Sequence, residues 1–145
     1  MATVHDVVAY LLEKKHPMTA MKVQKLVYYC QAWSLVWDDR KLFPEKIEAW
    51  VNGPVVPELF EKHQGKFELS DWTLGCADNL DDTAKETIDA VLEYYGDKTA
   101  QWLVDLTHLE SPWRDARKGL EPGERGDNEI TPAAMQDFYM SITNV

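Results

Sequence analysis

The fold is decided by residues 19–37, which read TAMKVQKLVYYCQAWSLVW. In a helix over this stretch, apolar and aromatic side chains surround most of the circumference, and only Gln24, Gln31, Ser34 and Asp38 form a narrow polar stripe. A helix that is apolar almost all round lies in the middle of a domain. Thr19 is placed to cap it. We therefore predict a central helix over residues 19–37.

The other periodic segments predict helices packed around this one. Apolar residues over 4–12 have helical spacing and predict a helix that ends at His16-Pro17. Thr3 is placed to cap this helix, with Asp6 as its partner in a variant of the capping box. Asp81 or Asp82 is expected to cap a helix that closes at Gly96. Further helices are expected over 57–63, from Asp97 to about 108, over 112–118 and from Thr131-Pro132 to about 142. The fold class is thus mainly α, a single domain over residues 1–145 with about six or seven helices.

Between the central helix and residue 57 the pattern changes. Residues 42–51 predict two short strands or extended segments, Leu42-Phe43 and 47–51, around a turn at Pro44-Glu45-Lys46. Asn52-Gly53 is a second turn signal, and Pro54 and Pro57 stiffen the chain beyond it. Residues 64–80 predict a packed loop anchored by Trp72 and Leu74, and residues 119–129 predict an exposed loop.

Charge is distributed unevenly along the chain. The formal net charge is −10; residues 1–65 are neutral, with 8 basic and 8 acidic side chains, whereas residues 66–145 carry 7 basic and 17 acidic ones. An acidic surface repels phosphate, so a nucleic acid is not expected as a direct ligand. The acidic half either steers a basic partner or simply keeps the protein in solution.

Composition otherwise fits a globular protein, at 45% hydrophobic and 28% charged residues. The six tryptophans and six tyrosines either fill a small helical core or contribute to a contact surface. Cys30 and Cys76 show no paired spacing, and the N-terminus lacks the basic and apolar regions of a secretion signal. No apolar run approaches the ~20 residues of a membrane span. We expect a cytoplasmic protein without a membrane partner.

Motifs of catalysis are absent from the sequence. The four histidines lack the spacing of a zinc site, and there is no glycine-rich phosphate loop and no nucleophile elbow. His108 and Glu110 are residue types that can bind a metal ion or act in a hydrolase. A histidine at the end of a helix is, however, also favoured by the helix dipole. Lys14, Lys15, Lys22 and Lys25 are too few for a DNA footprint. We therefore expect no catalytic, cofactor-binding or metal-binding residues, and a protein that acts by contact.

The order of several motifs resembles the Panacea domain, also called the SocA-like domain. The motifs are the run from Met21 to Trp33, then 47–50, then Gly53-Pro54-Val55-Val56-Pro57-Glu58-Leu59-Phe60, and finally 106–108 with 112–117. The resemblance extends over about residues 4–142 in the right order. Phe60 stands where the family often has tyrosine, which removes a hydroxyl group from that position.

This resemblance implies a function. It implies an antitoxin of bacterial or prophage origin that binds and neutralises a protein toxin encoded nearby. An alternative is an adaptor that delivers the toxin to a cellular protease. A hydrolase with scattered catalytic residues is a second alternative, from a different class.

The family motifs supply the candidate partner-binding residues. Gly53 is expected to serve a turn that needs a positive φ, and Pro54 and Pro57 are expected to stiffen this turn. Trp50 is expected to pack it against the central helix. The polar positions of the central helix either make specific hydrogen bonds, internal or to a partner, or only mark a solvent-facing stripe. Trp113, Arg114 and Arg117 either anchor the C-terminal segment or present an aromatic–arginine patch, and we favour the patch. The full set is Lys22, Gln24, Lys25, Tyr28, Gln31, Trp50, Gly53, Pro54, Val55, His108, Trp113, Arg114 and Arg117.

Overall fold

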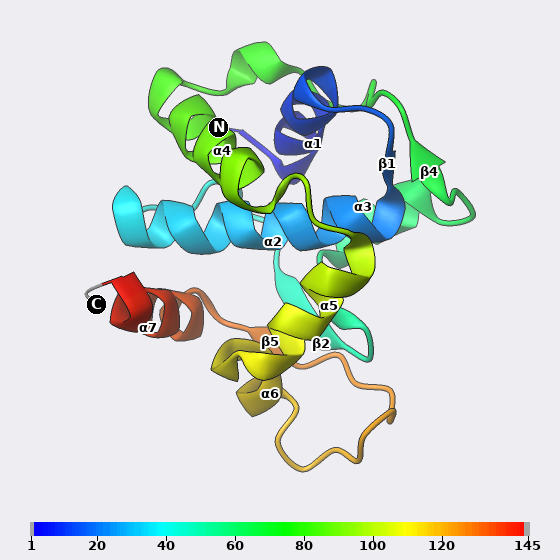
Figure 1. Cartoon of the computed structure of the whole chain (residues 1–145), viewed down its shortest axis with the longest axis vertical. Coiled ribbons are helices and arrows are strands. Elements are labelled where there is room, and N and C mark those ends of the chain that lie inside the picture. The colour runs from blue at the N-terminus through cyan, green and yellow to red at the C-terminus, as the bar shows by residue number, and fades with distance from the viewer. Residues whose placement is uncertain (1, 144–145) are drawn as a thin grey trace.

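A computed structural model describes residues 2–143 and shows a mainly α fold built around one helix. Seven α-helices lie in the described range: α1 (Val4–Lys14), α2 (Ala20–Trp37), α3 (Pro57–His63), α4 (Asp82–Tyr95), α5 (Ala100–Leu109), α6 (Ser111–Ala116) and α7 (Pro132–Thr143). Helix α2 runs through the centre, with α1 and α4 above it and α5 and α7 below it (Figure 1). The predicted mainly α class with a central helix is confirmed.

Helix α2 is central because almost its whole circumference is apolar. Val23, Leu26, Val27, Tyr29 and Cys30 are 0% exposed, although they point in different directions around the helix. The Thr19 side chain accepts a hydrogen bond from the Lys22 N–H and caps the helix.

The shorter helices begin where the sequence predicts, with one exception. The Thr3–Asp6 capping box opens α1, and the Asp81 carboxylate accepts from the Ala84 N–H to open α4. Helix α5, however, is capped by Thr99, so the prediction of Asp97 was wrong. Either side chain can cap a helix, and only one residue separates them, so local chemistry does not distinguish them.

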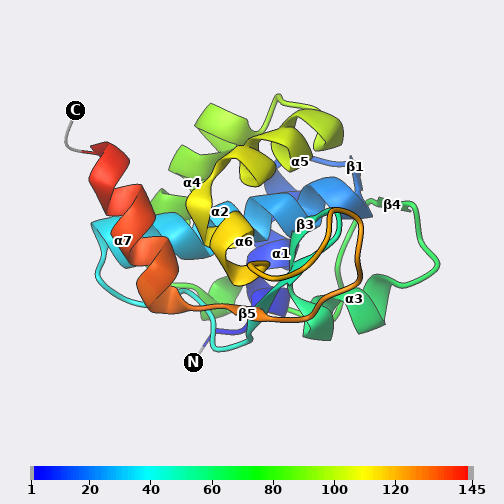
Figure 2. The same cartoon turned by 90° about the horizontal axis from the view of Figure 1, so that it is seen from below.

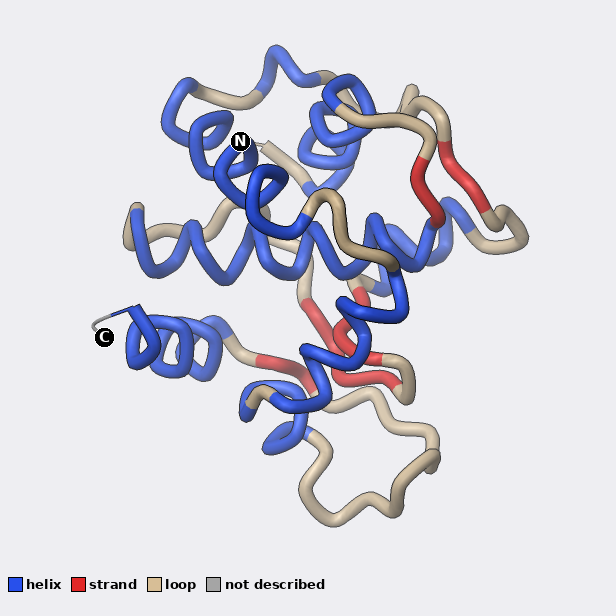
Figure 3. The backbone as a smooth tube through the Cα atoms, viewed as in Figure 1, coloured by secondary structure: helices blue, strands red, loops and turns tan. Residues whose placement is uncertain are grey.

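Strands contribute two small antiparallel sheets, which lie apart from each other (Figure 3). Strands β1 (Met18–Thr19) and β4 (Glu68–Leu69) form one pair; the other sheet has the order β3-β2-β5, with β2 (Ile47–Trp50), β3 (Gly53–Val55) and β5 (Glu129–Ile130). Trp50 pairs with Gly53 across a two-residue turn, and Ile47 pairs with Ile130. The hairpin therefore turns at Val51-Asn52.

Two details of the predicted non-helical segments were wrong. Leu42 and Phe43 form no strand, and the turn at residues 44–46 does not connect a hairpin. In the predicted loop over 64–80, Trp72 is 8% exposed and does anchor it, but Leu74 is 56% exposed and does not. A short 3₁₀ turn over Ala77–Asn79 follows in this loop.

Candidate functional site

A groove of about 850 Å³ opens beside the N-terminal half of α2. Its walls come from α2, from the β2–β3 hairpin, from α3 with the loop that follows it, and from residues 125–127. Seen from below, the loop over 119–128 arches past the hairpin on this side of the molecule (Figure 2). Clefts of this size are typical of ligand-binding sites. Four of the predicted residues line it, namely Gln24, Lys25, Trp50 and Val55.

The apolar wall of the groove is largely aromatic. The Trp50 ring packs edge-on against Phe60, with 5.0 Å between ring centroids. Phe60 in turn packs edge-on against the His63 ring. At the rim, Phe67 is 80% exposed and Met21 is 40% exposed, and both also line the groove. The rim therefore presents large apolar side chains to solvent.

Gln24 ties α2 to the segment between the hairpin and α3. Its Oε1 accepts from the Val56 N–H at 2.9 Å, and its Nε2 donates to the Val56 carbonyl at 3.3 Å. The same Nε2 lies 3.0 Å from Nε2 of His63, which can accept the hydrogen bond when it carries no proton. Burial lowers the pKa of His63, which favours that neutral form.

Gln31, two turns further along α2, also forms side-chain hydrogen bonds with the backbone of another segment. Its Oε1 accepts from the Leu42 and Phe43 N–H groups at 2.7 and 3.2 Å, and its Nε2 donates to the Phe43 carbonyl at 2.8 Å. Ser34 likewise donates to the Arg40 carbonyl. Gln24, Gln31 and Ser34 are all buried. The solvent-stripe interpretation of these residues was therefore wrong, and internal hydrogen bonding is what the structure shows.

Lys25 is a buried basic side chain in the groove wall. It is 1% exposed, and its Nζ donates to the Pro54 carbonyl at 3.0 Å. No ion pair among the described residues includes it. Burial lowers its pKa to about 7 because the charged ammonium loses its hydration.

Gly53 makes room for the Lys25 side chain. Its φ of +112° lies where side chains are strongly disfavoured, and a Cβ there would stand 2.8 Å from Cε of Lys25. The predicted positive φ at Gly53 is confirmed.

Tyr28 belongs to a buried polar network one turn further along α2 than Gln24. Its hydroxyl lies 2.9 Å from that of Tyr139 in α7, and Tyr139 and Tyr29 each donate to Oε1 of Glu110 at 2.7 Å. Burial raises the pKa of Glu110, while the two hydroxyl donors oppose that change. The network fastens α7 to the core, since one carboxylate oxygen receives donors from two helices.

The C-terminal motif holds the hairpin in place. The His108 ring stacks on Trp113 with 3.9 Å between centroids, and the Trp113 Nε1 donates to the Trp50 carbonyl at 2.8 Å. Arg117 is 7% exposed and donates to the Ala49 carbonyl at 3.0 Å. Anchoring is therefore observed for Trp113 and Arg117. Arg114 is exposed, and contact between this segment and a partner stays a prediction.

Lys22 lies outside the groove wall. Its Nζ donates to the Gly96 carbonyl at 2.6 Å, which ties the start of α2 to the end of α4.

The described residues show no arrangement that indicates catalysis. None of their hydrogen bonds joins His108 to Glu110, and no group of three or more His, Cys, Asp or Glu among them could hold a metal ion. Cys30 is fully buried, and burial raises the pKa of its thiol far above the ordinary value. No helix in the described range is both long and apolar enough to cross a membrane.

Comparison with known families identifies the scaffold. Residues 23–114 match the family described as Antitoxin SocA-like, Panacea domain. The chain belongs to this family. The matched range contains most of α2, the hairpin, α3, α4, α5 and the first residues of α6, and so most of the groove wall. No match was found among curated proteins or among solved structures.

Several groove residues were not predicted from the sequence. Phe60, His63, Lys66, Phe67 and Arg125 line the groove but were not among the candidates. Phe67 lies in a segment without periodicity, between charged residues, where one aromatic residue gives no signal. Arg125 reaches the groove only because β5 returns the chain to the hairpin.

Proposed function

We propose that this protein is the antitoxin of a bacterial toxin–antitoxin pair and neutralises its cognate toxin by direct protein–protein binding in the cytoplasm. The observation that carries the proposal is the match of residues 23–114 to the SocA-like antitoxin family. Antitoxins of this kind act on a protein partner, and we take the partner to be encoded beside the gene for this chain, on a chromosome or a prophage. The whole chain acts as one binding domain.

The structure supports a role by contact. The polar side chains of the family motif are largely engaged in fixing the scaffold, as for Gln24, Gln31 and Arg117. The open groove and its exposed apolar rim remain available for contact with a partner. Exposed apolar clusters beside a cleft are characteristic of protein-binding surfaces.

Growth rescue tests the proposal. The product of the adjacent gene is expressed from an inducible promoter, alone and together with this protein. We expect arrest of growth in the first case and normal growth in the second. A neighbour that is harmless alone, or equally toxic in both cases, would contradict the proposal.

The mechanism of rescue is read from the level of the toxin. Blocking by binding predicts that the toxin accumulates to an unchanged or higher level during rescue, in a stoichiometric complex that co-purifies. A protease-dependent shortening of the toxin's half-life would instead identify the protein as a degradation adaptor.

A further inference from the structure

We propose that the groove beside α2 binds a segment of the toxin in which an apolar side chain stands next to an Asp or Glu side chain, whose carboxylate pairs with Lys25. This inference rests on the proposed antitoxin function and assigns the partner chemistry and the surface. The occupant is a protein segment, because the groove combines an apolar wall with a small number of cationic groups.

The apolar part of the occupant is required by the aromatic wall and rim. Phe67 leaves 80% of its surface in solvent and Met21 leaves 40%, at the edge of a cleft whose wall holds Trp50 and Phe60. Burying such side chains against a partner removes apolar surface from water, and aromatic residues in clefts dominate the energetics of most interfaces. An apolar partner side chain fits between the rim and the edge-on Trp50–Phe60 pair.

The carboxylate is required by the cations of the groove. Lys25, Lys66 and Arg125 all line it, and none of the ion pairs formed by the described residues includes any of them. Of the acidic lining residues, Glu48 accepts a hydrogen bond from Trp50 Nε1 at 2.9 Å. The groove lining thus holds three basic side chains and two acidic ones, Glu48 and Asp127, on a chain whose net charge is −10.

Lys25 provides the strongest argument. When it is protonated, the buried Lys25 ammonium donates to one carbonyl, and its two other N–H groups have no partner among the described residues. An uncompensated buried charge is costly. An acidic side chain of the partner would supply the missing charge and a hydrogen-bond acceptor in one group. A polyanion such as nucleic acid is disfavoured by the overall negative charge.

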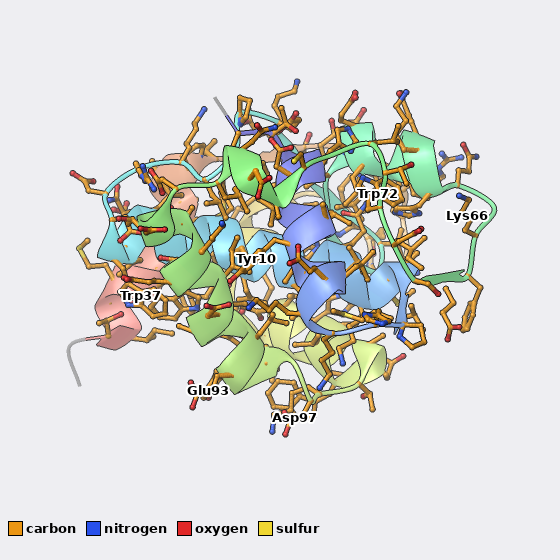
Figure 4. The ribbon with its side chains drawn as sticks, turned by 90° about the horizontal axis from the view of Figure 1, so that it is seen from above. Tyr10, Trp37, Lys66, Trp72, Glu93 and Asp97 are labelled. Carbon is orange, nitrogen blue, oxygen red and sulfur yellow. The ribbon has the colours of Figure 1, made fainter. Side chains whose placement is uncertain are left out.

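Binding measurements with matched variants test the inference. The probe is the purified product of the adjacent gene, titrated by calorimetry against the whole chain. We expect Lys25→Met and Phe67→Ser each to weaken binding by about tenfold or more, because one removes the buried charge partner and the other the exposed ring. The control is Trp37→Ser: Trp37 is also an exposed aromatic, at 47%, but it lies at the opposite end of the molecule from Lys66 (Figure 4). We expect a change of less than about twofold there.

The carboxylate is located with overlapping peptides that cover the toxin sequence, measured by fluorescence anisotropy. One peptide is expected to bind, and Asp→Asn or Glu→Gln at its acidic residue should weaken binding to the wild-type chain by about tenfold. Against Lys25→Met the same peptide change should have less than about a twofold effect, since the pair is already broken. Equal losses against both proteins would refute the pairing.

The two proposals fail in different ways. If the wild-type chain does not bind the neighbouring product at all, the antitoxin function is wrong, and the inference falls with it. If the wild-type chain binds tightly and both groove variants bind as tightly, with circular dichroism and urea midpoints showing that they fold, only the groove inference is wrong.

Discussion

Replacing Gln31 with leucine should destabilise the fold strongly, although the two side chains are close in size. The Gln31 amide satisfies two N–H groups and one carbonyl of the segment at Leu42 and Phe43, which are 5% and 0% exposed. Leucine supplies no donor or acceptor. Three buried backbone groups would then lose their partners at once.

The magnitude follows from the cost of an unpaired buried group. Each costs about 1–3 kcal/mol, so three cost about 3–9 kcal/mol if nothing relaxes. Partial access of water to the segment and the added apolar burial of leucine reduce this to about 3–4 kcal/mol. That is a large fraction of the ~5–15 kcal/mol by which a domain is stable.

Urea denaturation followed by circular dichroism measures the loss. With a slope of about 2 kcal/mol per molar urea, the midpoint should fall by about 1.5–2 M while the slope stays unchanged. The control is Gln101→Leu, because Gln101 lies on the surface, where its amide donates to the exposed Asp105 carboxylate. That change should stay within about 0.5 kcal/mol. A loss below about 1 kcal/mol for Gln31→Leu would show that the segment does not depend on the glutamine.

Three further outcomes are expected. Gly53→Ala should lower the free energy of unfolding by about 2–3 kcal/mol, measured in urea, because its φ is +112° and a Cβ would stand 2.8 Å from the Lys25 stem; an unchanged midpoint would contradict the tight turn. Burial lowers the pKa of Lys25 in the folded chain to about 7 from 10.5, so between these values the unfolded chain binds more protons and the free energy of unfolding rises with pH. Between pH 7 and 9 the wild type should gain about 2 kcal/mol of stability relative to Lys25→Met. Parallel curves of stability against pH for the two proteins would exclude a buried amine. In thermal unfolding, Asp81→Ala should cost about 1 kcal/mol, because it removes the cap of α4 on the Ala84 N–H. Arg40→Ala removes only the exposed ion pair with Asp81 and should cost at most about 0.5 kcal/mol. Equal losses would show that the ion pair provides the stabilisation.

Features encoded by neighbouring residues could be predicted from the sequence. The extent of α2 follows from a continuous apolar run after a capping Thr19, and both signals lie within the helix itself. The caps at Thr3 and Asp81 are equally local. The class of the fold follows from the same periodicities.

Features that depend on distant partners could not. Gln31 is polar, and the backbone groups that it bonds lie eleven and twelve residues away. The sequence alone therefore does not show whether its side chain is exposed or buried. The hairpin was misplaced because two turn signals compete, at 44–46 and at Asn52-Gly53. The backbone groups of Leu42 and Phe43 form hydrogen bonds with the Gln31 side chain instead of with a neighbouring strand.

The groove was the least predictable feature. Its wall combines short segments spread between residues 19 and 127, and no single one of them has a binding signature. Lys25 was a candidate because it is polar on an apolar helix, but its burial depends on the packing of Gly53 and Pro54 over it. Only the fold brings Phe67 and Arg125 to the same cleft.

The most direct test of the central claim is amide hydrogen exchange of this protein with and without the product of the adjacent gene. We expect binding to slow exchange in residues 20–25, 50–55 and 60–67, which line the groove, and to leave exchange on the exposed face of α4 unchanged. Protection confined to α4 and α5, with the groove segments exchanging as in the free protein, would contradict it.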